Sequence, residues 1–456
     1  IAALFTDGSF TALRSGVTAE EIEALSARLE AKKDFYLDLV RLRDELELAQ
    51  ALLGNGAALG LVKTDFQARA SSKDSKYGQS ASALQPLGVT ARAGATVAVY
   101  AQLPTDAPVY VVPTQYFGES GIWSGQAVRL ENGRNYITVP KIGSLEAERG
   151  GPLYLTYAGS DPEAIKIQVR VDEGSFVLPV LELSGWYELG EAGRRAAIPT
   201  YVEELERYVG ALGSAGLDTD IRNATEISTP SVLLSIPASQ ALAGLRGGDM
   251  ADALYDDVLA WEDVLFVANQ VQGIVPAGAS KADYRYPMTT RQNIRYMRMF
   301  AGAFMYAAGN HVGVGYGSTQ GLVCGKPVSS TGVGNANGLF GWGIAHEIGH
   351  NMDKLGKAET TNNIYSLAIQ AYDGGTMALP TRLTNSNIWD KVYEKTSAGR
   401  PGSAGNVFVQ LGMYWQLHLA YDGGDEPLDF FNRFFAAWKS GQYFNGASAY
   451  DDKVAL

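Results

Sequence analysis

The sequence predicts a multidomain α+β protein with a helical N-terminal segment, a β-sandwich domain and a mainly helical domain. Two changes of pattern along the 456 residues support this division. Helical periodicity dominates the first part, and a period of two dominates the second. Apolar helical patterns alternate with short strands in the third. A chain of this length has room for two to four domains, and the domains that we expect are 1–70, 71–180 and 181–456.

The helical segment begins at a capping box. Thr18-Ala19-Glu20-Glu21 places a hydroxyl at the first position and a glutamate three residues later, the pair that satisfies free N–H groups at a helix start. Apolar residues then recur at helical spacing, which predicts one long amphipathic helix that ends at about Leu53. Its apolar positions include Ile22, Leu25, Leu29, Phe35, Leu39, Leu42 and Leu46.

The middle region alternates apolar and polar residues with the period of β-strands. Strands are predicted at 96–100, 109–112, 136–139, 153–157 and 165–171, separated by Gly, Pro, Asn and Asp turns. This spacing predicts a β-sandwich of modest size. Polar and glycine residues between Ser71 and Ser82 indicate a loop or linker before it. Trp123 can stack on a sugar, although we expect it to pack in the core.

The third region mixes strands with apolar helices. Helices are predicted at 250–271, 291–308, 408–421 and 428–438, and a strand at 231–237. A further strand, His311 to Tyr316, is rich in glycine. On an edge strand, these glycines would leave room for a bulky substrate that pairs with the strand. An internal strand weakened by glycine fits the sequence equally well.

Composition narrows the classes of partner. The formal net charge of −12 argues against nucleic acid or an anionic membrane as the main partner. No apolar run reaches the roughly 18 residues that a membrane-spanning helix needs. The chain starts at Ile1 without a charged or apolar leader, and we expect its targeting segment to have been removed. The single cysteine, Cys324, cannot form an intramolecular disulfide and is predicted to be a buried apolar residue.

Five residues, His346-Glu347-Ile348-Gly349-His350, carry the clearest chemical signal. On a helix the two histidines lie one turn apart on the same face, which lets two imidazoles bind one Zn²⁺. Glu347 lies beside them, where it can accept a proton from water that the metal activates. Gly349 costs about 1 kcal/mol relative to alanine inside a helix. It indicates either a second backbone packed against the helix or ordinary close packing in the core.

A catalytic zinc needs a third protein ligand, and two acids compete for that place. Asp353 follows His350 by three residues and faces the same way on a straight helix. Glu359 follows Gly356, which can end the helix and turn the chain back, so that a second helix near Ala358 would bring Glu359 to the metal. Spacing alone leaves the choice open. In the second case Asp353 would orient a histidine or remain a solvated acid at the helix end.

The run from His346 to Ser366 resembles the enhancin-like zinc metallopeptidases, peptidase family M60, which include bacterial mucin-degrading O-glycopeptidases. The similarity is specific in the histidine motif and in Glu359-Thr360-Thr361-Asn362-Asn363. It implies His346, His350 and Glu359 as zinc ligands, Glu347 as the general base, and a zincin-type, gluzincin-like catalytic domain. Looser similarity covers about residues 60–440 and includes the segments 87–94, 300–311 and 414–417.

Other residues are candidates for binding the substrate or stabilising the oxyanion that forms during peptide hydrolysis. An arginine can bond the hydroxyl groups of a glycan and a tryptophan can stack on it. The candidates for contact with the substrate are His311, Gly313, Tyr316, Trp342 and Arg382, and those for the oxyanion are Tyr414 and His418 together with His311 and Tyr316.

The expected function is that of a secreted or surface-attached bacterial zinc endopeptidase, acting as a monomer. The resemblance alone implies that it cleaves beside O-glycosylated Ser or Thr in mucin-type glycoproteins. A general zinc protease or aminopeptidase without a glycan requirement is one alternative. A glycan-binding adhesin that keeps the zinc helix as a scaffold is another. An intact Glu347 argues against the adhesin, because a scaffold has no use for a base.

Overall fold

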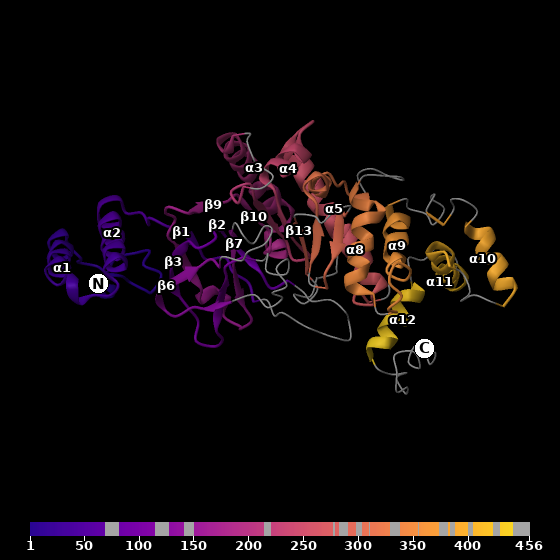
Figure 1. The fold of residues 1–456 in the computed structure, drawn as a ribbon, viewed down its shortest axis with the longest axis horizontal. Helices are drawn as coiled ribbons and strands as arrows, with labels where there is room; N and C mark the ends of the chain where they lie inside the picture. The colour runs from indigo at the N-terminus through magenta and orange to yellow at the C-terminus, as the bar shows by residue number, and fades with distance from the viewer. Residues whose placement is uncertain are drawn as a thin grey trace. The chain divides into compact units, whose positions relative to one another are not determined.

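The structure of the chain, a computed structural model shown in Figure 1, forms two compact units. The first comprises Ile1–Ala70, Ala83–Val180 and Ala211–Glu226, and the second comprises Ser71–Ser82, Leu181–Gly210 and Ile227–Leu456. The division into domains at 1–70, 71–180 and 181–456 stays a prediction. The residues that the structure describes are 1–68, 82–114, 127–140, 150–213, 220–276, 279–281, 291–297, 303–309, 311–328, 338–353, 355–373, 382–383, 388–399, 405–422 and 429–440.

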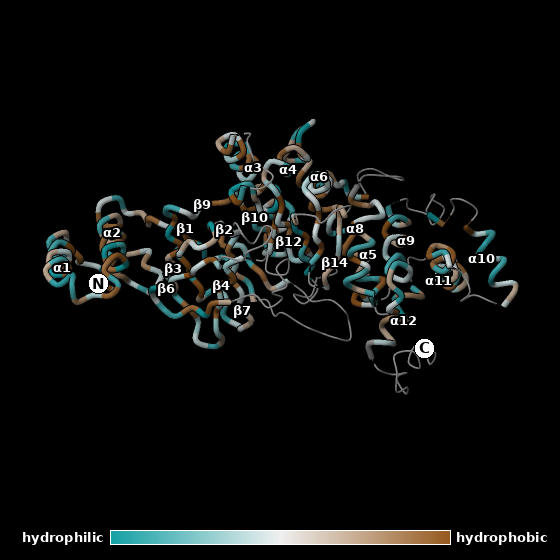
Figure 2. The backbone as a smooth tube through the Cα atoms, viewed as in Figure 1, coloured by the Kyte–Doolittle hydropathy of each residue, from teal (hydrophilic) through white to brown (hydrophobic). Residues whose placement is uncertain are grey.

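Two helices, α1 (Ala19–Ala31) and α2 (Leu39–Asn55), form the N-terminal helical segment. The Thr18 hydroxyl accepts the backbone N–H of Glu21 at 3.3 Å, so α1 begins where the capping box predicts. The prediction of one long helix is wrong. Phe35, one of the predicted apolar positions, is 85% exposed. The chain turns there so that the apolar faces of two short helices can bury each other. Figure 2 shows hydrophobic and hydrophilic residues mixed along both helices.

Two antiparallel sheets follow in the first unit, one in the order β1-β8-β3-β6 and one in the order β5-β4-β7-β2-β9. Side chains of both sheets, such as Val89 and Val99, form one apolar core. We propose that the sheets form the expected β-sandwich domain, and the shared core supports this. The strands are β1 (Leu61–Lys63), β2 (Gln85–Arg92), β3 (Thr96–Gln102), β4 (Val109–Val112), β5 (Val128–Arg129), β6 (Gly133–Thr138), β7 (Gly150–Tyr157), β8 (Lys166–Val169) and β9 (Ser175–Val177).

These strands confirm every strand predicted from the period of two in the middle region. Each predicted segment coincides with or overlaps one of β3, β4, β6, β7 and β8. Trp123 lies outside the described residues, as does the predicted loop from Ser71 except for Ser82.

A six-stranded sheet in the order β10-β11-β12-β13-β15-β14 lies mainly in the second unit, although β10 and β11 begin at residues of the first. β12 pairs in parallel with β13 and β13 pairs in parallel with β15, whereas β14 runs antiparallel to β15 at the end of the sheet. The strand predicted at 231–237 is confirmed by β12. The strands are β10 (Val180–Glu182), β11 (Thr225–Ser228), β12 (Val232–Ile236), β13 (Gln292–Tyr296), β14 (Met305–Ala307) and β15 (Val312–Val314).

Helices supply most of the core of the second unit. α5 has the predicted bounds and is buried on almost every side, while α11 and α12 begin within one residue of the predicted positions. The helices are α3 (Trp186–Leu212), α4 (Ala238–Leu245), α5 (Met250–Val271), α6 (Tyr316–Thr319), α8 (Trp342–Met352), α9 (Asn363–Asp373), α10 (Ile388–Ser397), α11 (Val407–Tyr421) and α12 (Asp429–Ser440). α8 and α9 lie side by side (Figure 1).

The helix predicted at 291–308 is wrong. The structure has β13 and β14 there, and residues 298–302 lie outside the described part. β13 lies between two strands and is almost entirely buried, although three of its five residues, Gln292, Asn293 and Arg295, are polar. A buried strand of this composition shows neither a continuous apolar run nor strict alternation, so the sequence pattern did not identify it as a strand.

The strand predicted at 311–316 is β15, and it is internal, because β14 covers its outer edge. A Cβ on Gly313 would lie 2.3 Å from the ring of Tyr306. The Tyr306 ring therefore occupies the space beside Gly313 that was predicted to accommodate a substrate. β14, not β15, is the edge strand at this end of the sheet.

Cys324 is exposed, which corrects the prediction that it is buried. Its sulfur lies 3.1 Å from the carbonyl oxygen of Gln320. Across the described residues, no helix combines the length and the apolar composition needed to span a membrane.

Candidate metal centre

The helix α8 presents the histidine motif. Its apolar residues Ile344, Ala345, Ile348 and Met352 are each at most 2% exposed and fix the helix in the core. The face that carries His346 and His350 is left partly accessible, with their side chains 18% and 24% exposed.

Three side chains meet at this face: His346, His350 and Glu359. The two Nε2 atoms are 3.1 Å apart. Oε2 of Glu359 is 3.3 Å from Nε2 of His346, and its Oε1 is 3.2 Å from Nε2 of His350. Ligand atoms at about 2.0–2.1 Å from a tetrahedral zinc ion are about 3.3 Å from one another. The donor set and its spacing therefore fit a zinc ion.

Glu359 lies in the loop between α8 and α9. α8 ends at Met352, Gly356 adopts the left-handed conformation with φ +72°, and α9 starts at Asn363, later than the second helix predicted near Ala358. Glu359 itself has φ +63°, a conformation that costs a non-glycine residue energy and that persists where the surroundings demand it.

Asp353, the competing acid, is engaged in the same turn. Its Oδ1 accepts the N–H of Leu355 at 2.9 Å, and its Oδ2 accepts the N–H of Gly356 at 3.2 Å and the Thr361 hydroxyl at 2.6 Å. The structure thus brings Glu359 to the histidines and uses the Asp353 carboxylate to shape the loop that carries Glu359.

Two asparagines at the start of α9 support His346. Nδ1 of His346 is 2.7 Å from Oδ1 of Asn363, and this nitrogen donates when Nε2 faces a metal. The Asn363 amide also donates to the carbonyl of Glu359 at 2.8 Å. Asn362 donates to the carbonyl of His346 at 3.3 Å. Neither asparagine has a role predicted from the sequence, although they follow Glu359 by three and four residues.

The contact that Gly349 permits explains how α9 comes so close. A Cβ on Gly349 would lie 2.1 Å from the carbonyl oxygen of Asn362. Of the two interpretations of this glycine, the packing of a second backbone is the one that the structure shows.

Glu347 lies between the two histidines in the sequence and is partly buried. Burial raises the pKa of this carboxyl above its usual range, the nearby Glu359 adds to the rise, and His346 opposes it. A raised pKa makes a carboxylate a better proton acceptor, which suits a general base.

Trp342 and Arg382, two candidates for contact with a glycan, lie together at the first turn of α8. The Arg382 guanidinium is 4.8 Å from the centre of the Trp342 ring and 5.5 Å from that of Phe408. The Trp342 and Phe408 rings meet edge to face at 5.8 Å. Phe304, which precedes β14 and is 62% exposed, lies near Gly343 in the same turn.

His311 and Gly313 belong to the interior of the sheet. His311 is 2% exposed, and its Nε2 lies 3.1 Å from both the Arg295 guanidinium and the Tyr306 hydroxyl. Burial, assisted by the Arg295 charge, lowers the pKa of His311 to about 2, so the ring is neutral. These contacts hold β13, β14 and β15 together.

The remaining candidates lie in separate places. The Tyr316 hydroxyl is 3.0 Å from that of Ser239. Tyr414 is half-buried on α11, and burial followed by the Asp353 charge raises its pKa. His418 is fully buried, with Nδ1 2.5 Å from Oδ2 of Asp422. An imidazole closed off in this way contacts the core rather than a substrate.

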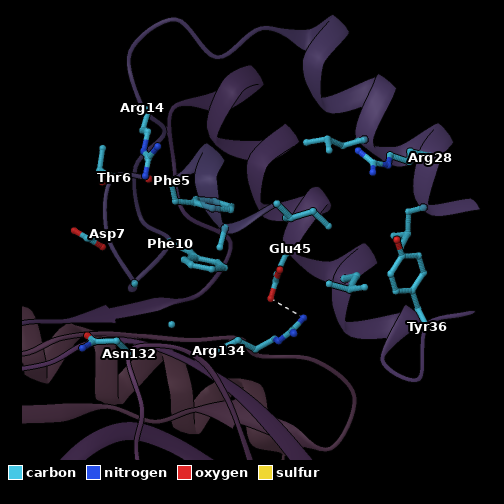
Figure 3. A pocket seen from close by; sticks show the side chains of 17 residues that line it. Phe5, Thr6, Asp7, Phe10, Arg14, Arg28, Tyr36, Glu45, Asn132 and Arg134 are labelled. Atoms are coloured by element: carbon cyan, nitrogen blue, oxygen red, sulfur yellow. Dashed lines mark hydrogen bonds and ion pairs between the residues drawn. The ribbon is translucent and has the colours of Figure 1, made fainter. Parts of the chain in front are cut away.

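A separate cavity of about 790 Å³ lies in the first unit, between residues 1–14, the helical segment and the start of β6 (Figure 3). Arg134 and Glu45, paired at 2.8 Å, face it, as do Phe5, Phe10 and other apolar residues. It contains none of the site residues predicted from the sequence, all of which belong to the second unit.

Several solved structures share the fold. A structure of the CBM32-1, CBM32-2 and M60 catalytic domains of ZmpB from Clostridium perfringens has a TM-score of 0.69 at 22% identity, and the match covers 98% of this chain but 44% of that one. The chain thus spans less than half of that relative. The M60 catalytic domain of ZmpC from Clostridium perfringens, in complex with the sialyl T antigen, matches at 22% identity with a TM-score of 0.60, covering 86% of this chain and 72% of that one.

A metallopeptidase from Bacteroides thetaiotaomicron matches at 16% identity with a TM-score of 0.66, covering 98% of this chain and 68% of that one. A comparison with curated proteins gives no match. The family model described as Peptidase M60, enhancin and enhancin-like matches residues 224–456, which contain the whole metal centre. The chain belongs to this family of peptidases.

Proposed function

We propose that the protein is a zinc endopeptidase whose ligands are His346, His350 and Glu359. The observation that carries this proposal is the set of donor separations of 3.1–3.3 Å among two imidazoles and one carboxylate. They are close to the separation of about 3.3 Å between ligand atoms of a tetrahedral zinc ion, with one Glu359 oxygen beside each histidine, and three protein ligands are the number that a catalytic zinc site uses. Zinc supplies a Lewis acid there, which lowers the pKa of water and polarises a carbonyl group.

Glu347 moves the proton in this proposal. Its carboxylate accepts a proton from the attacking water and passes it to the nitrogen of the leaving amine. Asn363 holds His346 so that Nε2 faces the metal, because Nδ1 donates to the amide oxygen.

The outer strand β14 is the proposed place for the peptide. Tyr306 lies opposite Gly313, the Phe304 carbonyl accepts the N–H of Gly315, and the Ala308 N–H reaches the His311 carbonyl. These alternate residues direct their backbone groups at β15. Met305 and Ala307 therefore direct theirs away from β15, at the edge of the sheet where the described residues supply no further strand. An extended substrate can pair there as a further strand.

The cluster of Trp342, Arg382 and Phe408 is the proposed contact for a glycan. Aromatic rings stack on sugar faces, and a guanidinium donates to hydroxyl or carboxylate oxygens. The related ZmpC domain was solved in complex with the sialyl T antigen. We propose by analogy that this chain cleaves beside O-glycosylated Ser or Thr in mucin-type glycoproteins.

Matched peptides test this substrate class. The zinc-loaded protein is incubated with one peptide that carries a single GalNAc on Ser or Thr and with the same peptide without the sugar, and products are read by mass spectrometry. We expect cleavage of the glycosylated peptide alone, with discrimination up to about 10⁴-fold, since a site built around sugar bonds leaves polar groups unpaired when the sugar is absent. Equal cleavage would leave a general zinc endopeptidase, and binding without cleavage an adhesin.

We also propose that the protein acts as a monomer outside the cell or at its surface, where mucin-type glycoproteins occur. Fractionation of cells that produce it, followed by detection of the chain, tests the location. Light scattering tests the oligomeric state. Recovery only from the cytoplasm would contradict the proposed location.

A further inference from the structure

Asn351, the residue after the ligand His350, connects α8 to the turn between β14 and β15. Its Oδ1 accepts the backbone N–H of Gly309 at 2.7 Å, and its Nδ2 donates to the backbone carbonyl of His311 at 3.1 Å. Asn351 is 3% exposed, so both bonds are shielded from water. The amide uses one acceptor and one donor at once, which neither an aliphatic side chain nor a carboxylate can reproduce.

The same strand also touches the first turn of α8. A Cβ on Gly343 would lie 3.3 Å from Sδ of Met305. From Gly343 to Asn351 the helix rises about 12 Å at 1.5 Å per residue. From Met305 to Gly309 an extended chain advances about 13 Å at 3.3 Å per residue. The two contacts therefore hold β14 alongside the part of α8 that carries His346, Glu347 and His350.

The two contacts differ in kind. The contact at Gly343 is van der Waals packing against a methionine, a flexible side chain that tolerates sliding. The contact at Asn351 is a pair of directional hydrogen bonds to backbone atoms. Of these two contacts with α8, the one at Asn351 therefore limits more strictly how far β14 can shift along the helix.

We propose that Asn351 is a positioning residue that sets the register between β14 and the metal ligands. This inference rests on the proposed function, in which a peptide pairs with β14. A peptide held by the strand would present its scissile carbonyl at a distance from the metal that depends on this register. A misplacement of about 1 Å can cost about 100-fold in rate.

Asn351→Ala is the variant that tests the register, and Asn432→Ala is its matched control. Asn432 is 5% exposed on α12, and its Nδ2 donates to the carbonyls of Gln270 at 2.9 Å and Val275 at 2.6 Å. Both substitutions therefore remove two buried bonds from an asparagine to backbone atoms. Asn351→Ser, whose hydroxyl can satisfy one backbone group, serves as a milder change in case the alanine variant does not fold.

For Asn351→Ala we expect kcat on a cleaved peptide to fall about 10- to 100-fold while KM stays within about threefold, since the strand still binds the peptide but holds it out of register. Zinc per chain should equal that of the wild type, and Asn351→Ser should lose less. Asn432→Ala should lower the melting temperature without changing kcat. Equal kinetic effects in the two alanine variants would overturn the proposal.

Hydrogen exchange gives a readout that does not depend on catalysis. Amides of residues 303–309 should exchange faster in Asn351→Ala than in either the wild type or Asn432→Ala. Unchanged exchange there would refute the role of Asn351. A wild-type protein that cleaves no peptide would refute the proposed function instead, and the exchange comparison would still decide whether Asn351 fixes β14.

Discussion

The Thr361 hydroxyl donates a hydrogen bond of 2.6 Å to the Asp353 carboxylate. This bond closes the loop whose middle carries Glu359. The two acids that compete for the metal in the sequence therefore have complementary places in the structure. Glu359 lies 3.2–3.3 Å from the histidine nitrogens, and Asp353 stabilises the loop that holds Glu359 there.

The first prediction separates the two acids by metal binding. Glu359→Ala should lose most of the bound zinc, because one of three protein ligands disappears. Asp353→Ala should weaken zinc binding by about 10- to 100-fold, the usual loss when a group that supports a ligand is removed. Metal per chain, measured by elemental analysis after dialysis against a graded chelator, gives the order. A greater loss in Asp353→Ala would make Asp353 the ligand.

The second prediction concerns Glu347. Glu347→Gln keeps the size of the side chain and removes its ability to accept a proton. Turnover should fall by at least about 10²- to 10⁴-fold, the usual contribution of a general base, while zinc stays bound. Turnover and metal content are measured on the same preparation, so that loss of metal cannot be mistaken for loss of the base. Turnover near that of the wild type would exclude Glu347 as the base.

Local patterns predicted much of this fold. α5 has its predicted bounds because a long apolar helix with an aspartate cap needs no tertiary information. The helix predicted at 291–308 failed because β13 is a central strand in which Gln292, Asn293 and Arg295 are buried, and such a strand shows neither an apolar run nor strict alternation. The prediction of one long N-terminal helix failed for another reason. Phe35 fits the spacing of the apolar helix positions, but it lies between two helices and is 85% exposed.

For the metal centre too, the sequence predicts some positions and not others. His346, Glu347 and His350 are adjacent on one helix, so their spacing alone places them together. The position of Glu359 depends on left-handed backbone at Gly356 and at Glu359 itself, and spacing cannot foresee it. The place of Asn351 could not be predicted either, because its partners, Gly309 and His311, are about 40 residues away in the sequence.

The third prediction is a pH dependence that comes from Glu262 on α5. Burial raises the pKa of this carboxyl from 4.5 to about 7, although the hydroxyls of Ser231 and Thr229 hydrogen-bond it. Its pKa is higher in the folded protein than in the unfolded chain. Glu262 therefore contributes stability that is complete below about pH 4.5 and is lost as the pH rises through about 7.

Glu262→Gln keeps the shape and cannot ionise, so it should flatten this part of the pH profile. Urea unfolding of metal-free protein between pH 5 and 8 measures the difference, since removal of the metal excludes pH-dependent metal binding, which would add its own effect on stability. The wild type should lose stability relative to the variant as the pH increases. Parallel curves would mean that Glu262 does not titrate in this range.

The last prediction tests the backbone contact between α8 and α9. A Cβ on Gly349 would lie 2.1 Å from the Asn362 carbonyl oxygen, which is rigid backbone and cannot swing away as a side chain would. Gly349→Ala should therefore push the start of α9 outward and draw Glu359 and Asn363 away from the histidines. We expect a loss of about 1–3 kcal/mol in stability from overpacking, together with weaker zinc binding. Gly210→Ala is the control, because Gly210 also lies in a helix, α3, but its added Cβ would have no atom of the described residues within 4 Å. That change should stabilise the protein by about 0.5–1 kcal/mol and leave zinc binding unchanged.

Thermal melting and a zinc titration on both variants test this prediction. If Gly349→Ala binds zinc as tightly as Gly210→Ala, the close approach of Asn362 is not what holds Glu359 at the metal.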